Sequence, residues 1–296
     1  MATTSSEQRT APARQRPAGA LPRPDAITLA CFAGVVLIAG ANPIAVRFGN
    51  AELAPFWGAA IRFTAGAVIL FAVAAFMRIP FPRGRALLGG VLFGVLSSFA
   101  AYAFIYVALR HVPAGHASSI MASVPLLTFF LAIGHRVERF RWRGLAGGLA
   151  SAAGIVVLSG AGATGGAPVK YLLMVVAAAA CAAESGIVIK KLPRIHPIMM
   201  NAIAMAVGSV LLYGTSFLAS EHHTLPHRAK TWGSLAFLII AGSVVMFVLY
   251  VTVINRWTVT GASYQFVLFP VVSVLLASQI ADEKITLSLA PPARDR

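Results

Sequence analysis

Charged residues and cysteines are both scarce in this chain. Only 11% of its 296 residues are charged and 58% are hydrophobic, whereas a soluble protein has about 25% charged residues. The two cysteines, Cys31 and Cys181, lie inside apolar runs, which excludes a disulfide scaffold. The shortage of charge excludes a disordered chain and an ordinary soluble enzyme, because a water-soluble core cannot bury so many long apolar runs. The composition therefore indicates a polytopic membrane protein.

Acidic residues are the scarcer of the two charge types. The chain has 9 Asp and Glu against 24 Lys and Arg, which gives a net charge of +15. A nucleic-acid-binding protein gathers its basic residues on one face. Here they stand singly or in short clusters between apolar runs. We therefore expect basic loops at a membrane surface, with lipids and no nucleic acid as partners.

The chain also lacks the motifs of common enzymes. It has no HExxH, no G-x-S-x-G, no phosphate-binding P-loop and no Cys/His cluster. Glu221, His222, His223 and His227 could suggest a metal, but they share one polar loop, and we favour a solvated loop. The alternative of a membrane-embedded enzyme would need several catalytic acids or histidines at one depth. We predict no enzyme, no cofactor and no metal site.

Apolar runs long enough to cross a bilayer are abundant. A hydrocarbon core about 30 Å thick needs roughly 20 apolar residues in a helix. The runs are too long and too uniformly apolar for barrel strands, whose hydrophobicity alternates, so we predict an all-α fold. The nine predicted spans are 26–46, 56–77, 86–109, 112–134, 144–161, 171–189, 197–219, 233–254 and 259–281.

Basic residues are distributed unevenly over the loops between these spans. The N-terminal tail and every second loop after it hold 15 of them, and the alternate loops hold five. Because cytoplasmic loops carry the excess of Lys and Arg, we predict a cytoplasmic N-terminus. Residues 1–25 have no periodicity and are rich in Ser, Ala, Pro and Arg, so we predict a disordered tail.

The chain contains an internal duplication with an offset of 145 residues. Five spans fall in the first copy, and an odd number makes the second copy cross the membrane upside down. We predict a first five-helix repeat over 26–161 and a second, inverted repeat over 168–289. Inverted repeats are typical of secondary transporters, although duplication can also serve only to build a stable bundle. The matched pairs are Ala117 with Ala262, Ser118 with Ser263, Pro125 with Pro270 and Glu138 with Glu283.

Residues in both repeats carry a family resemblance. They are Gly40-Ala41-Asn42-Pro43, Pro55-Phe56, Arg62-Phe63, Pro125, Glu138, Gly147, Gly154, Pro270 and Glu283-Lys284-Ile285-Thr286. In this order and spacing they resemble the EamA-type members of the drug/metabolite transporter superfamily. The resemblance implies ten helices in two inverted five-helix repeats, with a cavity lined by helices one, three, four, six, eight and nine. It also implies a bacterial inner-membrane exporter or exchanger of small metabolites.

The sequence departs from this family pattern after Glu283. The family has a tenth span there, whereas the polar residues 290–296 include two prolines and three charges and cannot begin a membrane helix. We therefore predict that the second repeat lacks its last helix. A truncated, transport-inactive membrane protein is the alternative reading.

Glu184 is the most informative candidate for the functional site. It is the only carboxylate well inside an apolar run, and an intramembrane charge is a functional-site hypothesis by default. Burial favours the neutral form of a carboxyl group, which suits proton coupling, and a carboxylate could also bind a substrate ammonium group. A structural hydrogen bond or a place near the membrane interface is the competing interpretation.

Other polar residues in the predicted spans suit a solute cavity. Arg62 could bind a substrate carboxylate, but we favour a structural role because helix two is not expected to line the cavity. The remaining predicted substrate contacts are Asn42, Tyr106, Tyr250, Tyr264 and Gln265, and the predicted hinge prolines are Pro43, Pro125 and Pro270.

The sequence as a whole predicts a secondary transporter. It would move a small organic solute, such as an amino acid, by alternating access, and no nucleotide-binding module is present to supply energy. The sequence leaves assembly into a homo-oligomer open.

Overall fold

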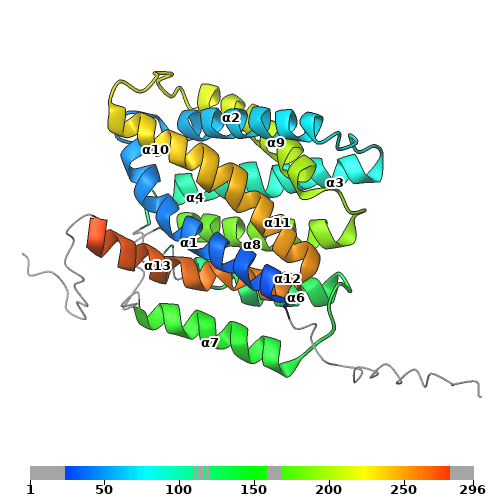
Figure 1. Cartoon of the computed structure of the whole chain (residues 1–296). Helices are drawn as coiled ribbons and strands as arrows, with labels where there is room; N and C mark the ends of the chain where they lie inside the picture. Colours follow the sequence, from blue (N-terminus) through cyan, green and yellow to red (C-terminus); the bar gives the residue numbers. More distant parts are fainter. Residues whose placement is uncertain (1–23, 110, 113–116, 118–119, 159–167, 281–296) are drawn as a thin grey trace, which may run out of the picture.

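The computed structural model describes residues 24–109, 111–112, 117, 120–158 and 168–280, and throughout this part the regular elements are helices (Figure 1). The predicted all-α class is therefore confirmed. The predicted tail before Pro24, the residue Glu283 and the polar end over 290–296 lie outside the described residues. The elements are α1 (Ala26–Gly49), α2 (Pro55–Phe76), α3 (Arg85–Phe93), η1 (Gly94–Ala100), α4 (Ala101–Leu109), α6 (Val124–Gly134), α7 (Trp142–Leu158), α8 (Val169–Lys191), α9 (Pro197–Leu218), α10 (Ala229–Ile239), η2 (Ile240–Val245), α11 (Met246–Arg256), α12 (Val259–Ser263) and α13 (Gln265–Ile280).

Six helical stretches among the described residues are long and apolar enough to cross a membrane. They are α1, α2, the continuous α3–η1–α4, α8, α9 and the continuous α10–η2–α11. This confirms the predicted polytopic membrane protein. The predicted spans 112–134, 144–161 and 259–281 correspond to shorter described helices, since α6 begins only at Val124 and the last run is divided at Tyr264 between α12 and α13.

Helix starts follow from local chemistry. Asp25 accepts a hydrogen bond from the Thr28 backbone N–H at 2.9 Å and so caps α1. Prolines stand in the first turn of α2, α6 and α9, where a missing N–H costs nothing. Pro125 therefore lies in the first turn of α6, which begins at Val124, and its predicted hinge role stays a prediction. Pro43 and Pro270 do lie inside α1 and α13.

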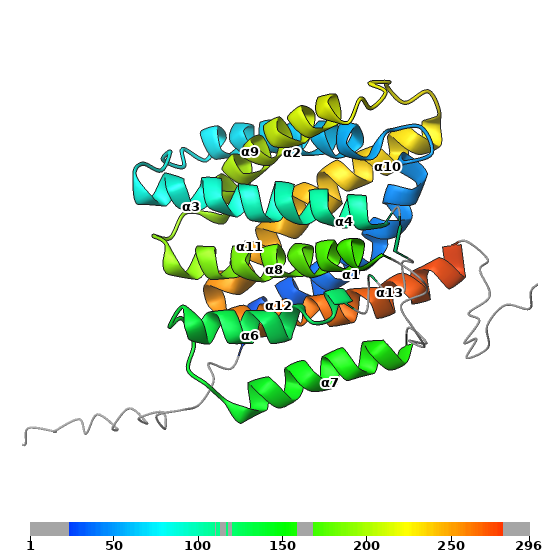
Figure 2. The same cartoon turned by 180° about the vertical axis from the view of Figure 1, so that it is seen from behind.

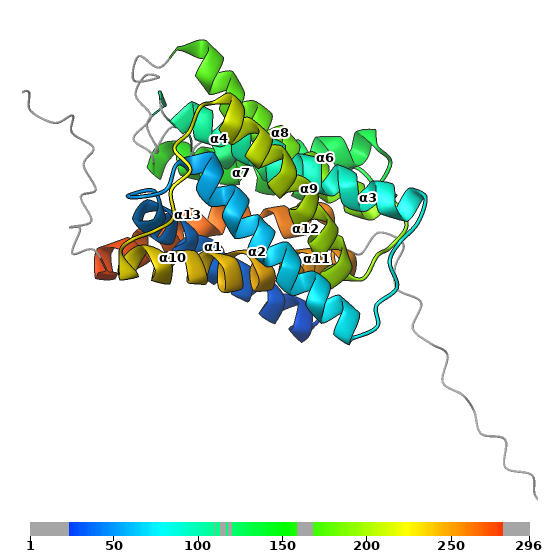
Figure 3. The same ribbon diagram turned by 90° about the horizontal axis from the view of Figure 1, so that it is seen from above.

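The helices pack closely through small residues. α2 and α9 lie side by side on one face (Figures 1 and 3), and α3–α4, α8, α6 and α7 follow one another across the back (Figure 2). A Cβ atom on Gly94 would meet the Ala204 backbone at 2.7 Å, so only glycine lets α9 approach η1 this closely. Such small-residue contacts are typical of helix pairs in membranes.

Two segments depart from α-helical geometry at related places in the sequence. Residues 94–100 (η1) and 240–245 (η2) form π-helical turns within continuous helices. Residues 95–100 stand 145 positions before 240–245, which is the offset of the sequence duplication. η1 packs on α9 and η2 packs on α2. π-helical segments occur frequently at functional sites.

Candidate functional site

A cavity of two adjoining chambers lies between the helices. The outer chamber, about 680 Å³, is lined by Asn42, Pro43, Asn50, Arg62 and Tyr106, among others. The deep chamber, about 210 Å³, is lined by Val35, Ser97, Ser185, Phe247, Tyr250 and Gln265, among others. Both are lined by Ala39, Tyr102, Ile105, Met246 and Phe269, so the two chambers adjoin.

Among the described residues, the lining of the cavity reaches one end of the bundle. The outer chamber extends to Asn50 and Ala51, in the loop that follows α1. The deep chamber ends at Tyr250, which is six residues, or about 9 Å of helix, before the end of α11. Below it the rings of Phe32 and Trp257 pack edge to face with centroids 5.9 Å apart. We call the end at residues 50–54 and 219–228 the mouth end, and the end at residues 135–141 and 256–258 the closed end.

Arg62 is the charged residue of this cavity. It is only 3% exposed, and it lies seven residues into α2, about 10 Å along the helix. Its Nε donates to Ser243 Oγ at 2.6 Å and its Nη2 donates to the Gly242 carbonyl at 2.7 Å. Both partners belong to η2. The structure thus adds helix two to the cavity lining, contrary to the expectation for Arg62.

Four of the predicted substrate contacts line the cavity. Asn42 and Tyr106 face the outer chamber, and Tyr250 and Gln265 face the deep chamber. Tyr264 instead packs against α7, because a Cβ atom on Gly147 would overlap its hydroxyl group. Whether the four cavity residues contact a solute stays a prediction.

Glu184 does not line either chamber. Its Oε1 lies 3.1 Å from His135 Nε2, and both side chains are about one-third exposed. Lys191 Nζ lies 3.1 Å from Nδ1 of the same imidazole. The carboxylate therefore stands near the closed end, as the competing interpretation of the sequence had it, and its coupling role stays a prediction.

The carboxylates at the two ends join distant loops to helix termini. At the closed end, Glu138 Oε1 accepts from Val259 N–H at 2.8 Å and from Thr260 N–H at 3.1 Å. At the mouth end, Glu221 accepts from Phe56 N–H and Trp57 N–H. Backbone N–H groups at a helix start carry partial positive charge, so a carboxylate stabilises them.

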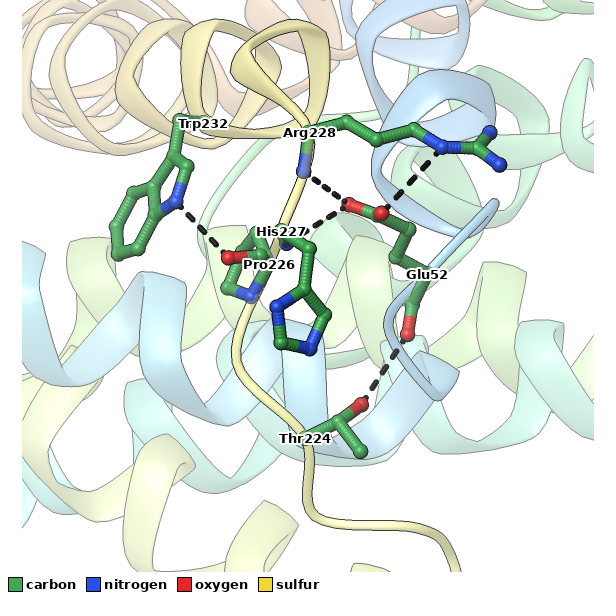
Figure 4. A network of polar contacts seen from close by, with 6 residues as sticks. All are labelled: Glu52, Thr224, Pro226, His227, Arg228 and Trp232. Carbon is green, nitrogen blue, oxygen red and sulfur yellow. Dashed lines mark hydrogen bonds and ion pairs between the residues drawn. The ribbon is translucent and has the colours of Figure 1, made fainter.

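Glu52 forms the other connection at the mouth end (Figure 4). Its Oε2 accepts from His227 N–H and Arg228 N–H, both at 3.2 Å, and Arg228 Nε lies 3.6 Å from Oε1. Thr224 donates to the Glu52 carbonyl. The Thr231 hydroxyl and these two N–H groups hold the pKa of Glu52 below its usual value. The loop after α1 is thereby fastened to the loop before α10.

The loop that holds His222, His223 and His227 is stabilised by contacts of the His223 ring. His223 Nε2 lies 3.2 Å from Ser216 Oγ, and its ring packs on Trp57 and Phe217. Among the described residues no group of three His, Cys, Asp or Glu is placed to hold a metal ion. The residues therefore stabilise the loop that carries Glu221.

Sequence reasoning missed Ser243, Met246 and Phe269. Asn42 Nδ2 lies 3.4 Å from Met246 Sδ, and Ser243 fixes the Arg62 guanidinium. Apolar residues in a membrane helix give no signal that separates cavity from lipid. The duplication offset of 145 residues relates η2 to η1, so a known π-helical turn at η1 would have predicted the one at η2.

Comparison with known proteins gives consistent results. Residues 26–160 and again 169–290 match the EamA-like transporter family. The inner membrane transporter YedA of Escherichia coli K12, itself named as uncharacterized, is 28% identical over 254 residues, 84% of this chain and 81% of YedA. The "Probable amino-acid metabolite efflux pump" of the same strain is 25% identical over 263 residues, 85% of this chain and 86% of the pump. A crystal structure with 22% identity shares the fold, with a TM-score of 0.70 over 90% of each chain.

Proposed function

The chain belongs to the EamA-like transporter family and is a membrane transporter, and on this premise we propose that it exports a small organic metabolite by alternating access. The two-chamber cavity, open at one end and closed at the other, carries this proposal. A solute-sized space with access from one side is what one state of an alternating-access cycle requires. An amino acid or a related metabolite is the proposed solute, in keeping with the name of one relative.

Two inverted repeats are the proposed basis of the alternation. Glu221, just after the end of α9, caps the start of α2, so these two helices run antiparallel. Glu138, just after α6, likewise caps the start of α12. The π-helical turns η1 and η2 stand at the duplication offset. The π-helical turns support duplication, and the two carboxylate contacts support opposite orientation of the copies. We propose a second state in which the mouth end closes.

The proposed orientation places the N-terminus in the cytoplasm of a bacterial cell, because basic residues are concentrated in the loops on that side. The mouth end then faces outward. The described conformation would thus be an outward-open state that releases the solute. No catalytic step is proposed, because the relatives are named as transporters.

Proton coupling is proposed to pass through Glu184. Its Oε1 lies 3.1 Å from Nε2 of the His135 imidazole, which is close enough for a proton to pass between the two groups. Both side chains are partly exposed at the closed end, where a cytoplasmic proton would have access to them. Pro43 and Pro270, which lie inside cavity-lining helices, are the proposed hinges.

The experiment is flux by the purified full chain in liposomes. Vesicles loaded with a labelled mixture of amino acids should lose label in a protein-dependent way, faster with an imposed proton gradient. A bulky residue introduced in the cavity should stop the loss. Absence of flux for every amino acid and organic acid tested would contradict the proposal.

A further inference from the structure

The described part of the membrane interior holds one buried guanidinium and no carboxylate opposite it. Arg62 is 3% exposed, and no Asp or Glu among the described residues lies within 4.0 Å of it. A buried charge is costly unless it is paired or faces a water-filled path. Charged residues inside membrane spans therefore mark sites of solute passage more often than sites of packing.

The neighbours of Arg62 hold the guanidinium without neutralising it. Ser243 Oγ accepts a hydrogen bond from Nε and the Gly242 carbonyl accepts one from Nη2, and both acceptors are uncharged. The Phe63 and Tyr102 rings lie 5.3 and 5.9 Å from Cζ and add only cation–π attraction. A guanidinium has five N–H donors, so its remaining donors, including both on Nη1, have no partner in the described part of the chain.

The outer chamber presents this cation beside a neutral amide. Asn42 lines the same chamber, but its Oδ1 is buried against Gly242 and has no hydrogen-bond partner among the described residues. The amide is uncharged, so it cannot neutralise the ammonium group of a solute. The described lining of both chambers contains no carboxylate. Arg62 is therefore the only charged residue in the described lining of the cavity.

The deep chamber has a different character. Its lining is dominated by apolar side chains, and the Ser97 and Ser185 hydroxyls already donate to backbone carbonyls of their own helices at 2.7 and 2.8 Å. Its volume is about 210 Å³, and an apolar cavity of about 150 Å³ is enough for benzene. The deep chamber thus fits an apolar group of about the size of one aromatic ring.

We propose that the solute is a small carboxylate with a ring-sized apolar group, held with its carboxylate on Arg62 and its apolar group in the deep chamber. The inference rests on the proposed transport function and names its substrate class. The planar guanidinium matches the geometry of a carboxylate and forms charge-assisted hydrogen bonds with it, the strong class of hydrogen bond. An amino group on the solute is then unnecessary, and a solute with only an amino group is excluded.

The first test compares three probes on the unaltered protein. Hydrocinnamate and phenethylamine share a phenylethyl group and differ in the charged end, whereas propionate keeps the carboxylate and lacks the ring. Calorimetry on the full chain in lipid nanodiscs should show hydrocinnamate binding at least about tenfold more tightly than either of the others, which corresponds to about 1.4 kcal/mol. Equal binding of phenethylamine, or no advantage over propionate, would overturn the proposal.

The second test assigns the preference to Arg62. Arg62→Gln should reduce hydrocinnamate binding about tenfold or more and leave no preference over phenethylamine, and Arg62→Lys should restore part of it. Ser243→Ala removes one holding contact and keeps the cation, so it should keep the preference for hydrocinnamate over phenethylamine even if both bind less tightly. A preference that persists in Arg62→Gln would overturn the assignment. If Arg62→Gln does not fold, the probe comparison on the unaltered chain still decides the substrate class.

Failure of this inference can be told from failure of transport. Binding is measured without a gradient and without flux. Hydrocinnamate that binds but is never moved would contradict transport and leave the anion site standing. Flux of amines or sugars, with no preference for carboxylates, would contradict the substrate class and leave transport standing.

Discussion

The middle of the bundle and its two ends use charge in opposite ways. Glu52, Glu138 and Glu221 stand at the ends, where they accept hydrogen bonds from N–H groups at helix starts. The middle holds the cation Arg62 with neutral partners. The carboxylates at the ends stabilise the fold by accepting hydrogen bonds from the backbone. The positive charge of Arg62 has no such counter-charge and is available to a ligand. Substitutions at the two places should therefore act on different properties.

The largest effect should come from filling the middle. Ala39 lines both chambers, so Ala39→Phe should lower liposomal flux at least about tenfold, which is about 1.4 kcal/mol of lost binding or passage. Val68→Phe, at a residue that is 63% exposed, is the matched control and should leave flux unchanged. Normal flux in Ala39→Phe would mean that solute does not pass through the chambers.

An intermediate effect should come from Glu184, the end carboxylate with a proposed coupling role. Glu184→Gln cannot release a proton to His135, so flux should fall several-fold and lose its dependence on pH. Flux measured between acid and alkaline buffers checks this. Glu52→Gln, a carboxylate change at the mouth end, should keep the full pH profile. An unaltered profile in Glu184→Gln would remove Glu184 from the coupling step.

A smaller effect, on stability alone, should come from Glu138. Glu138→Ala leaves the Val259 and Thr260 N–H groups without their acceptor and should cost about 1–2 kcal/mol. The melting temperature in detergent should fall by a few degrees, with hydrocinnamate affinity unchanged. Glu138→Gln keeps one acceptor oxygen and should lose less. A change in affinity without a change in melting would contradict the division between ends and middle.

The smallest effect should come from Asp25, whose action depends on pH. The Thr28 hydroxyl, Arg256 and the Thr28 N–H lower the pKa of Asp25 from 3.8 to about 2. Because the folded pKa is depressed, this stabilisation is present above pH 3.8 and is lost as the pH falls toward 2. Asp25→Asn keeps the cap acceptor, so its melting temperature should lie slightly below that of the unaltered chain at pH 6 and converge with it in acid. A constant difference at every pH would contradict this account.

Much of the fold could be predicted from the sequence, and less of the site. Spans such as 26–46, 56–77 and 197–219 correspond to full-length helices because a bilayer demands about 20 apolar residues in a row. The division of the last run at Tyr264 and the late start of α6 were not predictable from hydropathy alone. Asn42, Tyr106, Tyr250 and Gln265 line the cavity, and their contact with a solute stays a prediction, whereas Tyr264, one residue from Gln265, faces α7.

The sequence by itself determined the helical class, the membrane environment and the family, since these depend on composition and on the order of a few motifs. Only the tertiary structure decided which polar groups share a cavity. In a membrane helix both the lipid side and the protein side are apolar, so periodicity does not reveal which face turns inward. The partners of Arg62 are 180 and 181 residues away, in a π-helical turn that no local pattern announces. Contacts between helices that are distant in the sequence place Arg62 at the outer chamber and Glu184 outside both chambers.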